Sequence, residues 1–274
     1  MKKAVRIIGY ITLILMSLSM LFPFFAMLNL AFTDDNVIFK NTGVIFQTEL
    51  TLQNFKQVFN NIPITRYFLN SMIVAVITTL GQVLISSLAG YSFARFNFKY
   101  KNFWFLVILV TMMVPPQVNI IPLFFLMREL HLVDTYPALI LPGLFGGFGV
   151  FLMRQYFLSL PKDLEDSAKI DGCNIFQLFF KIAFPIALPA VVTLTIFTFV
   201  TTWNSFMWPL IITNSESMRT LPVGLAIFKG SFREITMWGD LLACSVVCTI
   251  PVVIIFLLGK KYFLSDLLSG AVKE

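Results

Sequence analysis

The sequence predicts an all-α polytopic membrane protein with six transmembrane helices, and three observations support that fold class. The 274 residues are 58% hydrophobic and 12% charged, against about 25% charge in an ordinary soluble domain. Six stretches contain no Asp, Glu, Lys or Arg, and each is long enough to cross a bilayer core as a helix. Strands of a membrane β-barrel would instead alternate over runs of about 10 residues. The composition excludes a soluble enzyme, a disordered chain and a collagen-like fibre.

The helices follow from the charge-free stretches, taken in order along one transmembrane domain that covers residues 1–274. The stretches are 7–33, 67–94, 102–127, 135–153, 182–215 and 241–259. We expect the helices at about 7–33, 67–94, 102–127, 135–153, 185–212 and 240–260. The first stretch is too long for a signal peptide and lacks a small-residue cleavage site, so we expect it to remain as an anchor.

Glycines and prolines interrupt two of these helices. Gly143 and Gly147 form a GxxxG motif, which lets helices approach closely, and we expect it to pack helices within one subunit. Pro115, Pro116 and Pro122 fall in the third helix. Broken helices often line substrate paths, but an ordinary proline kink is the expectation here.

The distribution of Lys and Arg predicts the orientation. With six spans, thirteen of the 20 basic residues fall on the side of the termini and seven on the other side. The positive-inside rule therefore places both termini in the cytoplasm. The charged segment between spans four and five, which we define as residues 160–189, is then cytoplasmic as well.

Several kinds of chemistry are missing from the sequence. It contains no GxxxxGK[ST], HExxH or GxSxG motif, and no charged residue lies inside the six stretches. Its single histidine, His131, is expected in a solvated loop, and Cys244 and Cys248 are expected to pack in an apolar helix. We therefore predict no catalytic residue, no metal site, no cofactor bound by this chain and no nucleic-acid partner.

The segment 160–189 predicts two short helices joined by a tight turn. Pro161 and three acidic residues suit the start of the first helix, and Gly172 suits its end. Asn174 and Gln177 have the spacing of a capping box for the second helix, whose apolar stripe would comprise Ile175, Phe179 and Ile182. An exposed apolar patch ringed by charge indicates a docking surface for a cytoplasmic partner; the alternative is a helix that lies on lipid headgroups.

The same segment resembles the EAA loop of ABC importer permeases, which couples the permease to its ATPase. Asp166, Ser167 and Ala168 occupy the EAA positions, Gly172 follows at the family spacing, and Ile182–Pro185 matches the Ile-x-Leu-Pro end. Asp replaces Glu, Ser replaces Ala and Phe replaces Leu, and the adjacent Glu165 is the candidate for any contact that needs a longer acid. The resemblance implies an ABC type I importer permease fold with these ATPase-coupling residues: Glu165, Asp166, Ser167, Ala168, Asp171, Gly172, Ile182 and Pro185.

Other stretches are similar to the second permease subunit of maltose-type carbohydrate importers. They include LAGYSFARF at 88–96, TTWNSFMWPL at 201–210 and SGAVKE at the end of the chain. The resemblance implies a carbohydrate importer of the bacterial cytoplasmic membrane. Its partners would be membrane lipid, a homologous permease, two ATPase subunits that use ATP and Mg, and an extracytoplasmic solute-binding protein. The alternatives are an importer of glycerol phosphate or a sugar acid, an intramembrane enzyme and a structural scaffold.

Two further groups of residues are candidates for contacts. Aromatic faces and amides bind sugars, so Asn70, Trp203, Asn204 and Phe206 are candidates for the substrate path; the alternative is that they bond neighbouring helices. The resemblance implies that the C-terminal tail reaches the ATPase; the alternatives are that it lies on lipid or is frayed. The small residues expected to make that contact are Ser269, Gly270, Ala271 and Val272.

Overall fold

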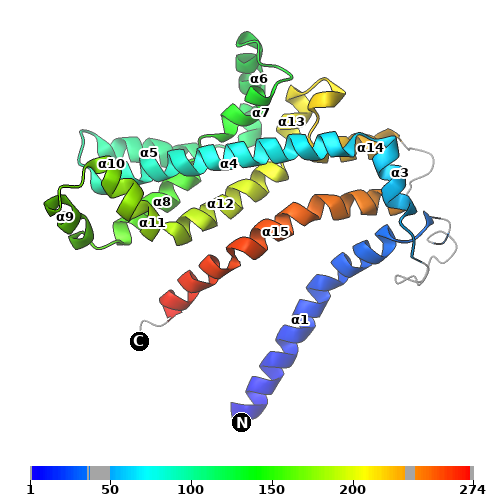
Figure 1. The fold of residues 1–274 in the computed structure, drawn as a ribbon, viewed down its shortest axis with the longest axis horizontal. Coiled ribbons are helices and arrows are strands. Elements are labelled where there is room, and N and C mark those ends of the chain that lie inside the picture. Colours follow the sequence, from blue (N-terminus) through cyan, green and yellow to red (C-terminus); the bar gives the residue numbers. More distant parts are fainter. Residues whose placement is uncertain (1, 36, 38–49, 232–237, 272–274) are drawn as a thin grey trace. The chain divides into compact units, whose positions relative to one another are not determined.

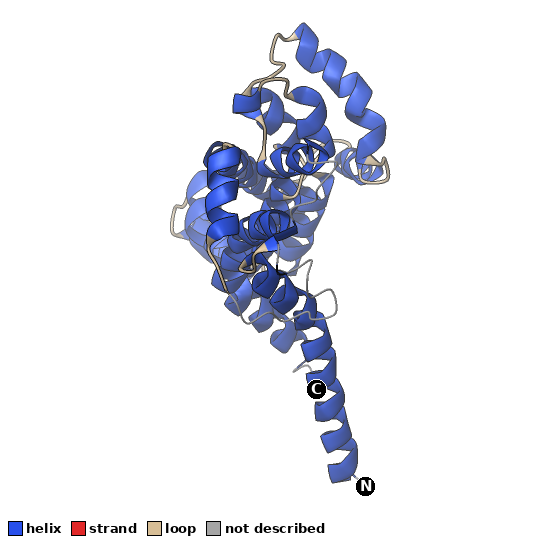
Figure 2. Cartoon of the chain, turned by 90° about the vertical axis from the view of Figure 1, so that its right-hand side faces the viewer, coloured by secondary structure: helices blue, strands red, loops and turns tan. Residues whose placement is uncertain are grey.

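The computed structural model describes residues 2–35, 37, 50–231 and 238–271, and the secondary structure in these ranges is helical throughout (Figure 2). The chain divides into two compact units, 1–66 with 221–251 and 67–220 with 252–274. The first unit comprises α1 (Lys2–Ala31), α3 (Gln53–Asn61), α14 (Leu221–Ser231) and the first part of α15 (Trp238–Ala271).

The second unit holds most of α4, the elements from α5 to η4 and the last part of α15 (Figure 1). Its elements are α4 (Ile64–Arg95), α5 (Lys101–Thr111), η1 (Pro116–Asn119), α6 (Ile120–Glu129), α7 (Tyr136–Ile140), η2 (Leu141–Gly143), α8 (Gly147–Ser159), α9 (Asp163–Ile170), α10 (Ile175–Leu178), the π-helical turn η3 (Phe179–Ala183), α11 (Phe184–Ile186), α12 (Leu188–Trp203), α13 (Met207–Ile212) and η4 (Glu216–Met218).

Three helices are continuous and apolar enough to cross a membrane: Val5–Ala31, Ile64–Arg95 and Trp238–Tyr262. They match the first, second and sixth predicted spans to within a few residues. The other three predicted spans correspond to pairs of helices that bend by 91°, 42° and 77° at a short break. The described residues therefore provide up to six spans, of which half are broken.

The third span is broken more sharply than the kink that the sequence predicts. Here α5 ends at Thr111 and the chain turns 91° before η1 and α6. Pro116 has no N–H to donate to the carbonyl of Met112, and the ring of Pro115 restricts the residue before it, so two consecutive prolines stop the helix instead of bending it.

The fifth span is also interrupted, and this corrects a sequence prediction. The chain leaves helical geometry after Trp203, at the end of α12, and regains it at Met207, where α13 begins. Asn204 and Phe206 therefore lie at a break between two helices, and not in the middle of one helix.

The GxxxG motif packs helices within the chain, as predicted. A Cβ on Gly143 would lie 2.6 Å from Cγ2 of Thr78 on α4, and one on Gly147 would lie 3.0 Å from the carbonyl oxygen of Ile108 on α5. Both approaches are closer than a side chain tolerates. The two glycines thus set the separation of α8 and its lead-in from α4 and α5.

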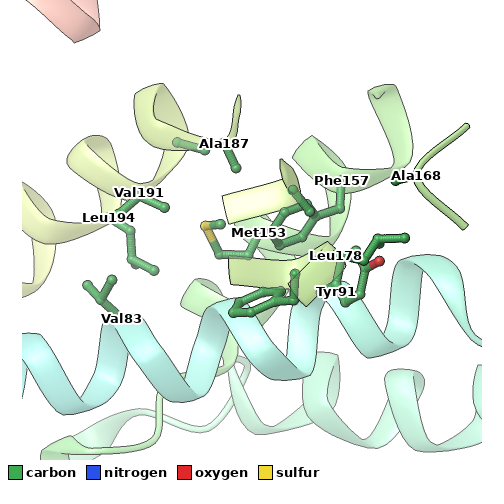
Figure 3. Close-up of a cluster of buried hydrophobic side chains, with 12 residues drawn as sticks. Val83, Tyr91, Met153, Phe157, Ala168, Leu178, Ala187, Val191 and Leu194 are labelled. Carbon is green, nitrogen blue, oxygen red and sulfur yellow. The ribbon is translucent and has the colours of Figure 1, made fainter. Parts of the chain in front are cut away.

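A buried apolar cluster joins α4 and α8 to the segment 160–189 and to α12. Figure 3 shows its residues converging from these elements, with Met153 and Phe157 of α8 at the centre, both with 0% exposure. Tyr91 of α4 packs edge-on against Phe157 and tilted against Phe179, at centroid distances of 5.3 Å in both cases. The cluster holds one side of the segment, so the opposite side is left free.

Candidate functional site: the segment between spans four and five

The first helix of the segment 160–189 ends in a turn that favours glycine. Gly172 has φ +80°, and its N–H donates to the carbonyl of Lys169 at 3.0 Å. No atom lies within 4 Å of where a Cβ would stand. The predicted glycine turn is confirmed, and its requirement is one of backbone conformation, not of space.

The second helix begins with the predicted capping box. The backbone N–H of Gln177 donates to Oδ1 of Asn174 at 2.9 Å, and the N–H of Asn174 donates to Oε1 of Gln177 at 3.0 Å. Two amides of the first turn are thereby satisfied by side chains. The direction in which α10 leaves the turn is set locally, by four consecutive residues.

The predicted apolar stripe along this helix is wrong. Ile175 and Phe176 are 60% and 72% exposed, whereas Phe179 is buried. Ile175 lies in the first turn of α10, ahead of the π-helical turn η3, in which Phe179 is buried in the apolar cluster and Ile182 packs against it. The segment therefore separates an exposed apolar group from a buried one.

A buried ion pair ties α9 to the end of α4. Nε of Arg95 lies 2.6 Å from Oε1 of Glu165, with side-chain exposures of only 5% and 9%. Nη2 of Arg95 also donates to the carbonyl of Leu160 at 2.8 Å. Glu165 therefore faces the interior, and the suggestion that it replaces the family glutamate at the exposed surface does not fit its position.

A second cation anchors α8 to the same part of the chain. The guanidinium of Arg154 lies 4.0 Å from the ring centroid of Phe105 on α5, and its Nε donates to the carbonyl of Phe93 on α4. Nζ of Lys101 donates to the carbonyl of Phe96 at 2.8 Å. The sequence did not single out Arg95, Lys101 or Arg154, because their partners are distant in sequence or are backbone carbonyls.

The outward side of the segment presents an apolar patch among charges. The apolar members are Leu164, Ile170, Ile175 and Phe176, and Ile170 is 87% exposed. Around them the charged side chains of Asp166, Lys169 and Asp171 are exposed, and Lys169 pairs with Asp166 at 3.0 Å. Ala168 is buried, Ser167 donates to the carbonyl of Asp163, and Ile182 and Pro185 continue into the segment that leads to α12. We name the four apolar side chains the exposed patch.

Asn70 bonds neighbouring elements of this chain; the sequence left open whether it does so or lines the substrate path. Its side chain is fully buried, and its Nδ2 donates to the carbonyls of Ser217 and Arg219 at 2.8 Å each. Its Oδ1 accepts from the hydroxyl of Tyr136 at 2.6 Å. The amide thus joins α4, α7 and the loop around η4. This is the bonding to neighbouring helices that the sequence analysis gave as the alternative to the substrate path.

Asp134 supports the same loop and was missed by sequence reasoning. It has φ +63°, and its Oδ1 accepts from the backbone N–H groups of Asn214 and Ser215 at 2.9 and 3.1 Å. Partial desolvation opposes ionisation, but the hydrogen bonds from Ser215 and Asn214 outweigh it and lower the pKa of the Asp134 carboxyl. An aspartate just before Tyr136 carries no sequence signal for a partner eighty residues away.

The other candidates for the substrate path differ in exposure. Trp203 is buried and packs on Phe68 and Phe199, with the Phe199 ring stacked at an interplanar angle of 11°. Asn204 is exposed at the break, and Phe206 is half-buried beside it. Among the four predicted residues, Asn204 is the one whose side chain faces outward.

The C-terminal tail continues the sixth span as one helix. α15 runs without interruption through Ser269 and Gly270 to Ala271, so Gly270 does not end it. Val272 lies outside the described residues. Within the ranges that the structure describes, no cluster of three or more potential metal ligands occurs.

Comparison with known proteins places these features in a family. Residues 82–267 match the model for the binding-protein-dependent transport system inner membrane component. The chain is 38% identical over 269 residues to the arabinooligosaccharides transport system permease protein AraQ of Bacillus subtilis, covering 96% of this chain and 95% of that one. It is 30% identical over 275 residues to the sn-glycerol-3-phosphate transport system permease protein UgpE of Yersinia pestis, covering 98% of both chains.

A solved structure supports the same fold. A chain from the crystal structure of a bacterial ABC transporter involved in the import of the acidic polysaccharide alginate matches with a TM-score of 0.85 at 22% identity, over 95% of this chain and 97% of that one. Because the family model covers residues 82–267 and the AraQ relative is 38% identical over nearly the whole chain, the chain belongs to the family of inner-membrane components of binding-protein-dependent transport systems.

Proposed function

We propose that this chain is a transmembrane subunit of an ATP-driven carbohydrate importer and that it couples a separate ATPase to the translocation path. The observation that carries the proposal is the segment 160–189. It is anchored on one side by the Arg95–Glu165 ion pair and the buried cluster, and it exposes an apolar patch on the other. A protein that only spans a membrane has no use for such a surface.

The contacts of the segment 160–189 provide a path by which a movement of the exposed patch reaches α4 and α12. A partner that moves the exposed patch moves α9, and α9 is held to α4 through Glu165 and Arg95. The same segment continues through η3 and α11 into α12, with a bend of 77°. Closure of an ATPase dimer on the patch would therefore shift α4 and α12 together, which suits a transporter that alternates between two states.

The partners and the orientation belong to the same proposal. The exposed patch lies on the cytoplasmic side with both termini, where it binds one of two ATPase subunits, which use ATP and Mg. A homologous permease completes the path, and an extracytoplasmic binding protein delivers the solute. The chain itself is not an enzyme, and the membrane is the cytoplasmic membrane of a bacterium.

The solute is best assigned as an oligosaccharide, because the AraQ relatives have 37% and 38% identity and the glycerol phosphate relative has 30%. Asn204, exposed at the break in the fifth span, is the proposed contact for solute hydroxyls.

The test is uptake in proteoliposomes that contain the complete complex. Unlabelled arabino-oligosaccharide should compete with a labelled oligosaccharide, and glycerol phosphate should not. Asn204→Ala should raise the concentration needed for half-maximal uptake, while Thr202→Ala, two residues earlier on α12, serves as the matched control. Uptake inhibited by glycerol phosphate alone would overturn the carbohydrate assignment.

A further inference from the structure

One carboxylate in the first unit is buried without a hydrogen-bond partner among the residues that the structure describes. Asp240 lies in the first turn of α15 and has 0% exposure. Neither of its carboxylate oxygens has a hydrogen-bond partner in the described chain. A carboxylate in that position is costly when ionised, because burial removes its hydration and no described donor compensates for the loss. Ionisable residues at membrane depth are accordingly expected to bind something.

The surroundings of Asp240 are built from three segments. Figure 1 shows the end of α1, the short helix α3 and the start of α15 at one end of the first unit. Nδ2 of Asn54 on α3 donates to the carbonyls of Ala31 and Thr33 at 3.0 and 2.7 Å, and so closes the end of α1. A Cβ on Gly239 would lie 2.3 Å from the same nitrogen, so α3 and α15 are in close contact there.

A second acid stands beside Asp240. Oδ1 of Asp35 accepts the backbone N–H of Gly239 at 2.8 Å and so caps the start of α15. Burial raises the pKa of the Asp35 carboxyl, while the hydrogen bond from Gly239 acts in the opposite direction. Two carboxylates in one partly dry junction repel each other when both are ionised.

The other described groups around the junction carry no positive charge that would neutralise this pair. Asp34 adds a further acid next to Asp35, and α3 contributes the neutral Asn54, with Lys56 exposed. On α15 the nearest titratable group is the buried thiol of Cys244, one turn along the helix. The described side chains of α14, from residue 221 to residue 227, carry no charge.

We propose that Asp240 is a proton-binding site and that its proton holds the junction of α1, α3 and α15 together. With the proton bound, Asp240 is neutral and Asp35 remains free to cap α15 as the single carboxylate. Without the proton, the buried carboxylate of Asp240 and the half-buried carboxylate of Asp35 are both charged at the same junction. The start of α15 is then pushed away from Asp35, and the Gly239 hydrogen bond is weakened. The inference does not depend on the transported solute.

The sign of the pH effect follows from where the proton is held. The folded chain binds a proton at Asp240 that the unfolded chain releases at lower pH. Stability therefore falls as the pH rises through the range in which the folded chain gives up this proton. Asp240→Asn keeps the neutral shape and removes the titration, so its stability should lack that fall.

The experiment is infrared difference spectroscopy of the purified full chain in detergent, titrated from about pH 5 to about pH 9. The wild type should show the carbonyl band of a protonated carboxylic acid that fades as the pH rises, and Asp240→Asn should lack it. Asp134→Asn is the matched control, since Asp134 is held ionised by two backbone N–H donors, and it should keep the band. Thermal unfolding over the same range should show the wild-type loss of stability and its absence in Asp240→Asn.

Three results would overturn the proposal. One is a wild-type spectrum with no titrating carboxylic-acid band. Another is a band that persists unchanged in Asp240→Asn. The third is stabilisation of the wild type by Ca²⁺ or Mg²⁺ that disappears in Asp240→Asn, which would make the site a cation site.

Discussion

Some residues of α9 anchor the segment 160–189 to the rest of the chain, and others lie on its exposed side. Two ion pairs that involve this eight-residue helix show the difference. Glu165 and Arg95 are almost completely buried, whereas Asp166 and Lys169 have side-chain exposures of 64% and 61%. Removal of one partner from a buried pair leaves an uncompensated charge, whereas exposed pairs contribute little.

Glu165→Ala should therefore destabilise the protein by about 3 kcal/mol or more, because Arg95 is left charged and buried. Asp166→Ala, the matched change one residue along, should cost less than about 1 kcal/mol. Thermal unfolding of the two purified variants measures the difference. Equal losses of stability would show that the Arg95 pair does not anchor α9.

Asn70→Ala should act on the fold and not on solute recognition. The substitution removes the amide that donates to the carbonyls of Ser217 and Arg219 and accepts from the hydroxyl of Tyr136. Each buried group that is left unpaired costs about 1–3 kcal/mol. We expect a lower melting temperature and a lower maximal uptake rate with an unchanged half-saturating concentration. Unchanged stability with weakened solute affinity would return Asn70 to the substrate path.

Residue roles were predictable where the partner lies a few residues away in the chain. The capping box of Asn174 and Gln177 and the turn at Gly172 need only local geometry, and both predictions are confirmed. The burial of Glu165 depends on Arg95, seventy residues earlier. A sequence without an alignment carries no signal for such a pair.

The helices, like the individual residues, were predictable only in part. The first, second and sixth spans were predicted well, because a long charge-free run is sufficient for a continuous helix. The breaks in the other three spans were not predicted. The bend of 91° between α5 and η1 and the break at Asn204 lie inside charge-free runs. Hydropathy is high on both sides of each break, so it does not reveal where the helix ends.

The turn between α9 and α10 provides an element-scale test. Gly172→Leu should place a Cβ in a left-handed conformation at a cost of about 1–2 kcal/mol, although the space is open. Relief of that strain rotates α9 relative to α10 and moves the exposed patch. Uptake should fall by an order of magnitude or more while ATPase association and membrane insertion persist.

Gly172→Asn is the matched control, since Asn tolerates this backbone region better than Leu, and it should keep most of the uptake. Coupled uptake at the wild-type rate in Gly172→Leu would mean that the turn geometry is unimportant for coupling.

The tail of α15 gives a second element-scale prediction. Because α15 continues unbroken past Tyr262 to Ala271, deletion of residues 265–274 removes about two turns of helix and leaves the sixth span intact. We expect normal membrane insertion and a several-fold loss of ATPase recovery or of coupled uptake. Complete ATPase recovery together with wild-type uptake in the truncated chain would show that the tail is dispensable.

At the scale of the whole molecule, the second unit carries the segment 160–189 and the broken spans, and the first carries α1, α3, α14 and the start of α15. Length and composition were enough to predict a multi-span membrane protein. They could not predict that half of the spans are broken. The proposed coupling requires that the exposed patch of the segment 160–189 binds an ATPase.

Photo-crosslinking in the assembled complex tests that claim most directly. A photoreactive phenylalanine analogue replaces Ile170, which is 87% exposed in the patch, and a matched sample carries it in place of Leu106, which is 56% exposed on α5. The account predicts a crosslink from position 170 to the ATPase subunit, with a yield that changes when ATP is added, and none from position 106. Crosslinks from position 170 to lipid alone, in a complex that still imports solute, would contradict it.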